Sequence, residues 1–114
     1  MSPRARITTS VAACAVFALV AAGARADEAA AKGAFEANKC SNCHSIEKLG
    51  MKRKIASEKT AGPDLSAVGS KHDAAWIVKW CMREVEKDGK THKSEYKGTK
   101  DDLQAIADWL ATLK

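Results

Sequence analysis

Apolar residues near the C-terminus recur with the period of an α-helix. The recurring positions, three or four residues apart, are Leu103, Ile106, Ala107, Leu110 and Leu113, with Trp109 beside them. Such spacing forms one apolar stripe along a helix. Thr99 precedes the stripe, and Asp102 stands three residues after Thr99, as in a capping box with Asp in place of Glu. We therefore predict a helix that begins after Thr99 and packs through one face.

Two earlier segments also carry helix signals. DEAAAKGAFEANK, residues 27–39, is rich in alanine and has acidic residues in its first turn. Gly33 lies inside this segment. Because glycine costs about 1 kcal/mol relative to alanine within a helix, we expect another helix to cross closely there. AAWIVKWCMREVEK, residues 74–87, follows Asp73, a residue type favoured at helix N-caps, and predicts the second helix.

The remaining segments predict long loops. No sustained run of alternating β-branched residues indicates a strand. GPDL, residues 62–65, is a turn signal, and KDGKTHKSEYKG, residues 87–98, is polar and rich in lysine. Long irregular loops are uncommon in so small a domain unless they enclose something. The expected fold class is therefore all-α, with helices and loops wrapped around a bulky group.

The first 26 residues have the composition of a targeting segment. Two arginines form a positive start, residues 11–22 are apolar, and residues 24–26 have an A-x-A cleavage pattern. The apolar run is too short to cross about 30 Å of hydrocarbon as an anchor. We predict a secretory signal peptide over residues 1–26 and one mature domain over residues 27–114, placed in the periplasm of a bacterium.

Removal of this leader changes the charge balance. The full chain has a formal net charge of +5. The leader holds three arginines, Arg4, Arg6 and Arg25, and no acidic residue, so the mature domain would carry +2. A nearly neutral exported domain is a poor partner for nucleic acid. We expect neither a nucleic-acid partner nor a membrane span after the leader is removed.

The candidate chemistry is concentrated in KCSNCHSI, residues 39–46. Cys40 and Cys43 are three residues apart, and His44 follows at once. Zinc usually takes two spaced pairs of ligands, and a thioredoxin-like redox site needs a βαβ setting; the sequence offers neither. Covalent haem needs two thiols for thioether bonds, an adjacent imidazole and export. The pattern favours one haem c bonded to Cys40 and Cys43, with His44 as the proximal iron ligand, over a zinc or disulfide site.

With this motif in place, the chain resembles the small class I c-type cytochromes. GAFEANKCSNCH looks like the family's first helix running into its haem motif, with Gly33 and Phe35 at the helix-crossing positions. TKDDLQAIADWLATLK looks like the closing helix, with Trp109 and Leu110 packed on the first helix. The resemblance covers nearly the whole mature chain and implies the all-α fold of that family.

The resemblance extends to the turn and to the activity. GPDL looks like the family's turn, which implies that the carbonyl of Pro63 accepts a hydrogen bond from His44 and fixes the imidazole. The family's activity implies a one-electron carrier, not an enzyme. Two other functions remain open: a haem-based binder or sensor of CO or NO, and the haem subunit of a larger oxidoreductase complex.

The distal iron ligand departs from the family's pattern. The resemblance implies a methionine from the loop before the last helix, but residues 87–98 contain none. On a helical wheel, Cys81 lies near the centre of the apolar arc of the second helix and Met82 at its edge. A leftover thiol in an oxidising compartment also indicates coordination. The sequence thus favours Cys81 as the distal ligand, then Met82, and then His92, whose setting among lysines is more typical of a solvated loop histidine than of a ligand.

Basic residues gather in two loops. One loop holds Lys48, Lys52, Arg53, Lys54 and Lys59, and the other holds Lys87, Lys90, Lys93, Lys97 and Lys100. In the family fold such loops border the haem edge, where they would steer docking of a redox protein with an acidic surface. Ordinary solvated lysines explain the pattern equally well. Whether the chain forms a homodimer or heterodimer stays open.

Overall fold

The computed structural model describes residues 27–114, and the predicted signal peptide, residues 1–26, lies outside the described residues. The helical elements are residues 27–37, η1 (Cys40–Asn42), η2 (Glu47–Leu49), η3 (Val68–Ser70), α2 (Ala74–Cys81) and α3 (Lys100–Ala111). Between residues 27 and 114 no strand forms, and the only β-type pairings are isolated bridges. The prediction of an all-α fold is confirmed.

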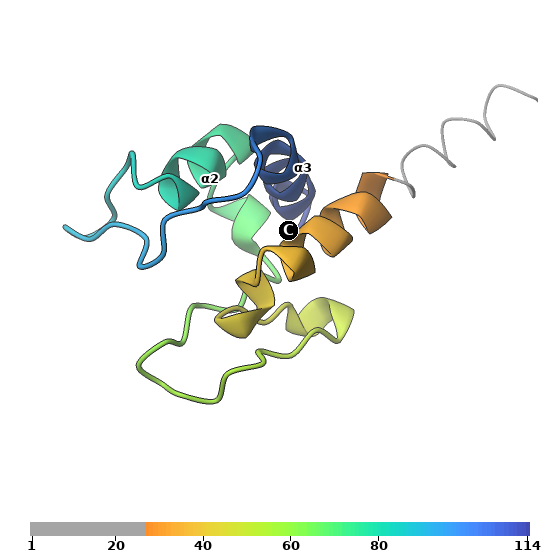
Figure 1. Ribbon diagram of the computed structural model, residues 1–114, viewed down its shortest axis with the longest axis horizontal. Coiled ribbons are helices and arrows are strands. Elements are labelled where there is room, and N and C mark those ends of the chain that lie inside the picture. Colours follow the sequence, from red (N-terminus) through yellow and green to blue (C-terminus); the bar gives the residue numbers. More distant parts are fainter. Residues whose placement is uncertain (1–26) are drawn as a thin grey trace, which may run out of the picture.

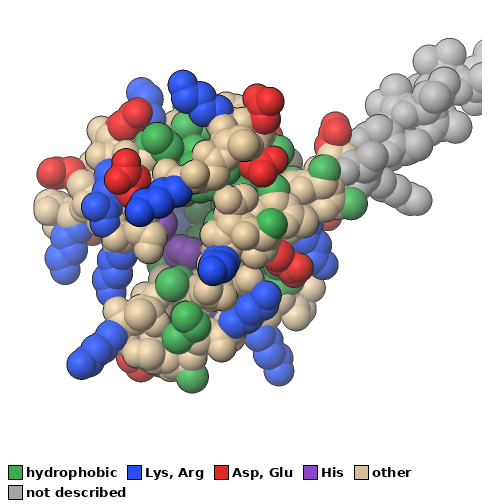
Figure 2. Space-filling model, in the orientation of Figure 1, with side chains coloured by type: hydrophobic (Ala, Val, Ile, Leu, Met, Phe, Trp, Pro, Cys, Tyr) green, Lys and Arg blue, Asp and Glu red, His purple; other side chains and the backbone are tan. Residues whose placement is uncertain are grey.

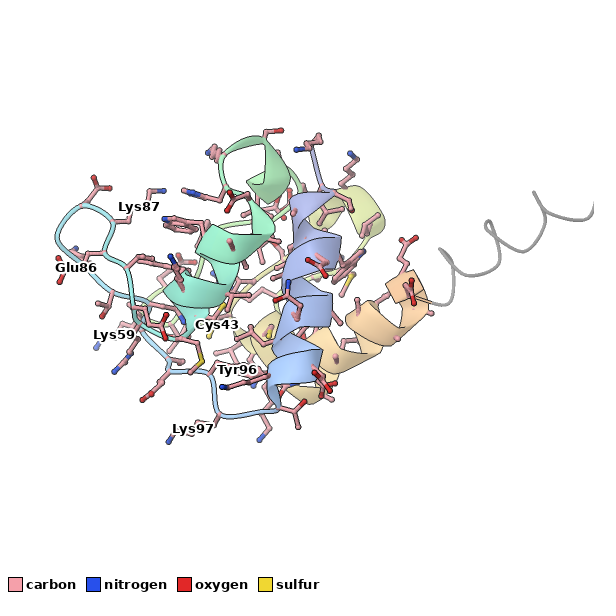
Figure 3. All side chains as sticks on the ribbon, turned by 90° about the horizontal axis from the view of Figure 1, so that it is seen from above. Cys43, Lys59, Glu86, Lys87, Tyr96 and Lys97 are labelled. Atoms are coloured by element: carbon pink, nitrogen blue, oxygen red, sulfur yellow. The ribbon has the colours of Figure 1, made fainter. Side chains whose placement is uncertain are left out.

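Helix α3 lies at the centre of the fold. It packs on α2 and on η3, and Figures 1 and 3 show it between α2 and the helix of residues 27–37. Every residue of the predicted apolar stripe is buried, and so is Trp109. Phe35 is 1% exposed and meets Trp109 edge to face, with ring centroids 5.7 Å apart. The predicted packing of the closing helix on the first one is therefore confirmed.

Both predicted helix starts carry their caps. Asp73 Oδ1 accepts a hydrogen bond from the N–H of Trp76 at 2.8 Å, and Thr99 Oγ1 accepts one from the N–H of Asp102 at 3.2 Å. Each bond satisfies a backbone donor that the first turn of a helix leaves without a helical partner. These short-range signals therefore place the first residues of α2 and α3 as predicted.

Helix α2 ends earlier than predicted. The helix expected to reach residue 87 stops at Cys81, with Met82 as its C-cap. Arg83 then adopts a left-handed conformation with φ of 59°, which an α-helix of L-residues cannot continue. Its guanidinium donates to the backbone carbonyls of His92, at 2.8 Å, and Lys93. The chain after α2 is therefore a loop, held against the end of the helix by Arg83.

Gly33 does not mark a helix crossing. The residue is exposed, and a Cβ atom built on it would meet no atom within 4 Å. The prediction of a close crossing at Gly33 is therefore wrong. The physical reason is the helical period: Ala31 and Phe35 are buried on one face, and Gly33, two residues from Phe35, lies about 200° round the helix on the exposed face.

The two basic loops are joined to each other. Lys93, in the loop that follows α2, donates from its Nζ to the backbone carbonyl of Lys59 in the loop before η3. In Figure 1 both loops extend from the side of the fold away from the helix of residues 27–37. No helix in the described part of the chain is long and apolar enough to cross a membrane.

Candidate functional site

The CxxCH segment forms a tight turn. Cys40 begins η1 and Cys43 caps it, and the N–H groups of Cys43 and His44 both donate to the carbonyl of Cys40, at 3.2 and 3.0 Å. Because a 3-10 turn repeats every three residues, side chains at positions i and i+3 stand on the same side. The turn therefore presents both thiols to one region, with His44 directly after them.

Neither thiol of the CxxCH segment is paired with another described cysteine, and the Cys40 thiol is held protonated. Burial raises the pKa of Cys40 to about 11, and the neighbouring Cys43 adds to this shift. Neither cysteine forms a disulfide with another described residue. Metal-binding and redox-active cysteines are instead held as thiolates by a low pKa. Within residues 27–114 no three His, Cys, Asp or Glu side chains gather as a metal-binding group. The raised pKa of Cys40 is thus unlike that of a thiolate in a zinc or redox site.

His44 is held by the GPDL turn. Its Nδ1 lies 2.8 Å from the carbonyl oxygen of Pro63, and the N–H of Gly62 donates to the carbonyl of Cys43 at 2.8 Å. A Cβ atom on Gly62 would overlap the His44 ring, so only glycine leaves room for the imidazole. Burial lowers the pKa of His44, although the Pro63 carbonyl acts to raise it. A neutral ring that donates from Nδ1 leaves the lone pair of Nε2 free for a metal.

These features fit covalent haem. The thiols, the fixed imidazole and the glycine that makes room for it lie within two short segments, residues 40–44 and 62–63. On the face shown in Figure 2, histidine side chains lie at the bottom of a hollow between the two loops. A haem bonded to both cysteines would place its iron beside Nε2 of His44.

Asp64 attaches the turn to the chain that follows His44. Its Oδ1 accepts hydrogen bonds from Ser45 Oγ and from the N–H of Glu47, both at 2.9 Å. Although burial acts to raise the pKa of Asp64, hydrogen bonds from Glu47, Ser66 and Ser45 hold it below its usual value. The Asp64 carboxylate therefore holds the GPDL turn in place, and this turn holds the imidazole of His44.

We expect Asp64→Asn to destabilise the domain by about 1 kcal/mol, because exposed hydrogen bonds to a carboxylate are partly replaced by water. The pKa of Asp64 is depressed by folding, so its contribution to stability is present above the ordinary pKa of 3.8 and is lost as pH falls through the folded-state pKa. Urea denaturation at pH 7 and at pH 3 would check this. A difference between wild type and variant that grows toward acid pH would contradict the expectation.

His92 lies near His44. The two rings are nearly parallel, with an angle of 9° between their planes and centroids 6.1 Å apart. Nδ1 of His92 bonds to the carbonyl of Ser94. Trp80 meets the His92 ring at 65°, with centroids 5.8 Å apart. The loop after α2 thus brings a second imidazole, also engaged through Nδ1, close to His44.

Cys81 and Met82 lie at the end of α2. Both are half-buried, and Met82 is the C-cap of the helix. Burial raises the pKa of Cys81 to about 11, and the neighbouring thiol of Cys40 adds to the shift. His72 is stacked on Trp76 at 3.5 Å between centroids. The structure therefore places Cys81 near Cys40 and places His92 near His44.

Four residues of the site were not singled out in the sequence. Gly62 and Asp64 belong to the quoted GPDL turn, but only the turn's proline was assigned a role. Arg83 and Trp80 act on the loop after α2 through contacts across the chain. The sequence did carry a signal for Gly62, because this glycine stands directly before the proline of the turn. No local pattern distinguishes Arg83 from other basic residues.

The fold and the site define a small all-helical domain with two adjacent thiols and a neutral imidazole prepared for covalent haem. The family model described as Cytochrome c matches residues 28–114, and the chain belongs to the cytochrome c family. Neither a comparison with curated proteins nor one with solved structures gives a match. As a member of this family, the chain has haem-based electron transfer as its general activity. Its cofactor is a covalently bound c-type haem with its iron.

Proposed function

We propose that the protein is an exported, periplasmic one-electron carrier whose single haem is bonded to Cys40 and Cys43 and ligated by His44. The observation that carries the proposal is the 2.8 Å contact of His44 Nδ1 with the Pro63 carbonyl, beside two unpaired thiols. This contact leaves Nε2 as the ring nitrogen that can bind iron. Haem bound there supplies a reversible one-electron couple. The composition of residues 1–26 supports export.

The chain's own residues hold and orient this group. Pro63 fixes the tautomer and plane of the His44 ring, and Gly62 leaves room for it. Ile46, two residues after His44, is fully buried and anchors this segment in the apolar core. These roles are those of a binding scaffold, so we infer an electron carrier and not an enzyme.

Expression of the full chain in a bacterium that attaches haem c tests this proposal. We expect periplasmic protein that begins at Asp27, has the mass of residues 27–114 plus one haem, and shows a reversible one-electron wave in voltammetry. Cys40→Ser and Cys43→Ser should each lower the yield of haem protein and lose one thioether bond. Cys81→Ser, the matched control, should keep both bonds. Protein without haem, or haem protein that stays in the cytoplasm, would refute the proposal.

We infer that the partner is a redox protein with an acidic docking surface. The bond from Lys93 to the Lys59 carbonyl joins the two basic loops. Figure 3 shows Lys59, Lys87 and Lys97 at the outside of the molecule and Cys43 toward its interior. Cations gathered near a haem would attract an anionic partner, at a rate that falls with salt.

Charge reversal measures this steering. With Lys87→Glu and Lys97→Glu combined, we expect oxidation of the ferrous protein by ferricyanide to slow about tenfold at low ionic strength. Stopped-flow traces over a range of salt concentrations would show the difference shrinking as salt rises. Lys32→Glu, on the helix of residues 27–37, is the control and should change the rate less. Equal rates for all three proteins would contradict a docking role for the loops.

A further inference from the structure

His44 and His92 stand 48 positions apart in the sequence, yet their rings are nearly parallel, with centroids 6.1 Å apart. A metal–imidazole bond is about 2.0 Å long and the bonded nitrogen lies about 1.1 Å from the ring centre, so two imidazoles on opposite sides of one metal have centroids about 6.2 Å apart. The observed separation of the centroids equals this distance within about 0.1 Å, and the nearly parallel rings leave room for a single metal atom between them.

Both imidazoles are also prepared in the same way. Nδ1 of His44 is bonded to the carbonyl of Pro63, and Nδ1 of His92 to the carbonyl of Ser94. Histidines that bind a metal almost always donate their other N–H to a carbonyl, carboxylate or water, which fixes the tautomer and the ring orientation. Each ring is thus left with Nε2 as the nitrogen that can bind iron.

We propose that His92 is the second axial ligand of the haem iron, through Nε2, so that two histidines coordinate the iron. The inference rests on the proposed function, since it requires haem attached at Cys40 and Cys43. It differs from the ranking obtained from the helical wheel, which favoured Cys81 and Met82. That wheel assumed a helix through residue 87, whereas α2 ends at Cys81.

The surroundings of Cys81 agree with this assignment. Cys40 and Tyr96 are ionisable neighbours of Cys81, and His92 is an ionisable neighbour of His44. Cys40 bonds to the rim of a covalent haem, so a thiol beside it lies near the rim, whereas a group beside the His44 imidazole lies near the iron. A half-buried, protonated Cys81 then needs no iron bond to explain its position.

Arg83 and Trp80 act as positioning residues for His92. Arg83 donates from Nε to the carbonyl of His92 at 2.8 Å and also bonds the carbonyl of Lys93. Trp80, on α2, covers His92 edge to face. One guanidinium therefore holds the carbonyls of two successive residues, His92 and Lys93, and the last turn of α2 supports the ring. Two imidazole ligands would also leave no open position for CO or NO, which favours the carrier over a gas sensor.

The spectrum of the ferric protein tests the assignment. We expect wild type to be low-spin and to lack a sulfur-to-iron charge-transfer band. His92→Ala should become largely high-spin, bind CO in the ferrous state, and return to low-spin when imidazole is added. Cys81→Ser and Met82→Leu, the matched controls, should keep the wild-type spectrum. If either control becomes high-spin while His92→Ala stays low-spin, the proposal is overturned.

A measurement on the wild-type holoprotein covers the case in which His92→Ala does not fold. Pulsed EPR of ferric protein labelled with ¹⁵N-histidine should detect two iron-bound imidazole nitrogens. A single bound imidazole overturns the assignment of His92 and leaves the proposed function intact. Absence of covalent haem from the wild-type protein, by mass and by the pyridine haemochrome spectrum, overturns the proposed function instead.

Removal of the Arg83 contacts tests the positioning role separately. We expect Arg83→Ala to speed displacement of the distal ligand by cyanide about tenfold, because two charge-assisted hydrogen bonds to the loop are lost. Arg83→Lys, which keeps the charge and one donor group, should restore part of the wild-type rate. An Arg83→Ala protein that binds cyanide at the wild-type rate would show that Arg83 does not position His92.

Discussion

Replacing Phe35 by alanine is expected to lower the free energy of unfolding by about 3–5 kcal/mol. The Phe35 side chain is 1% exposed and is one of the two largest fully buried side chains among the described residues. Its ring packs edge to face against Trp109, and this contact joins the helix of residues 27–37 to α3. Alanine would lose the apolar burial and leave a cavity between the helices. Urea denaturation of the haem-bound protein, compared with wild type, measures the loss.

Phe35→Leu is the matched control for this prediction. Leucine keeps most of the apolar volume but not the edge-to-face contact with Trp109, so we expect a loss of about 1–1.5 kcal/mol. A small domain has a total stability of about 5–15 kcal/mol, so the alanine variant should be near the limit of folding. An alanine variant as stable as the leucine variant would show that the helix contact is not the main support of the core.

Replacing Gly62 by alanine is expected to disturb both stability and the haem environment. The added Cβ would overlap the His44 ring, and the ring and the Pro63 carbonyl cannot both keep their positions. Overpacking of this kind costs about 1–3 kcal/mol. With His44 as the proposed iron ligand, a displaced imidazole also changes the ligand field of the iron. We therefore expect lower stability together with a changed ferric spectrum and a shifted reduction potential.

Gly33→Ala is the control for a glycine-to-alanine change without overlap. Gly33 is helical, and its Cβ position is free of neighbours, so alanine should stabilise the protein by about 1 kcal/mol. The two variants make the same chemical change and should differ in sign. A Gly62→Ala protein with unchanged stability and spectrum would mean that the turn can move without disturbing His44.

Much of the fold could be predicted because its signals are local. The apolar stripe from Leu103 to Leu113, the caps at Asp73 and Thr99, and the CxxCH motif each depend on residues within one or two turns of each other. Periodicity decides which face of α3 is buried, and a cap satisfies donors within the same first turn. These features therefore appear in the structure as predicted, while the length of α2 and the role of Gly33 do not.

Local pattern determined that residues 27–114 are helical without strands and that Cys40, Cys43 and His44 lie together in one turn. Only the tertiary structure decided which group stands near His44. The helical periodicity that ranked the candidate ligands holds as far as Cys81 and fails from Met82 onward. The helix ends there because Arg83 adopts a left-handed conformation. The Arg83 guanidinium binds the carbonyls of the residues nine and ten positions further on. The position of His92 depends on those hydrogen bonds and on its contact with the Trp80 ring. Neither interaction can be predicted from the spacing of residues in the sequence.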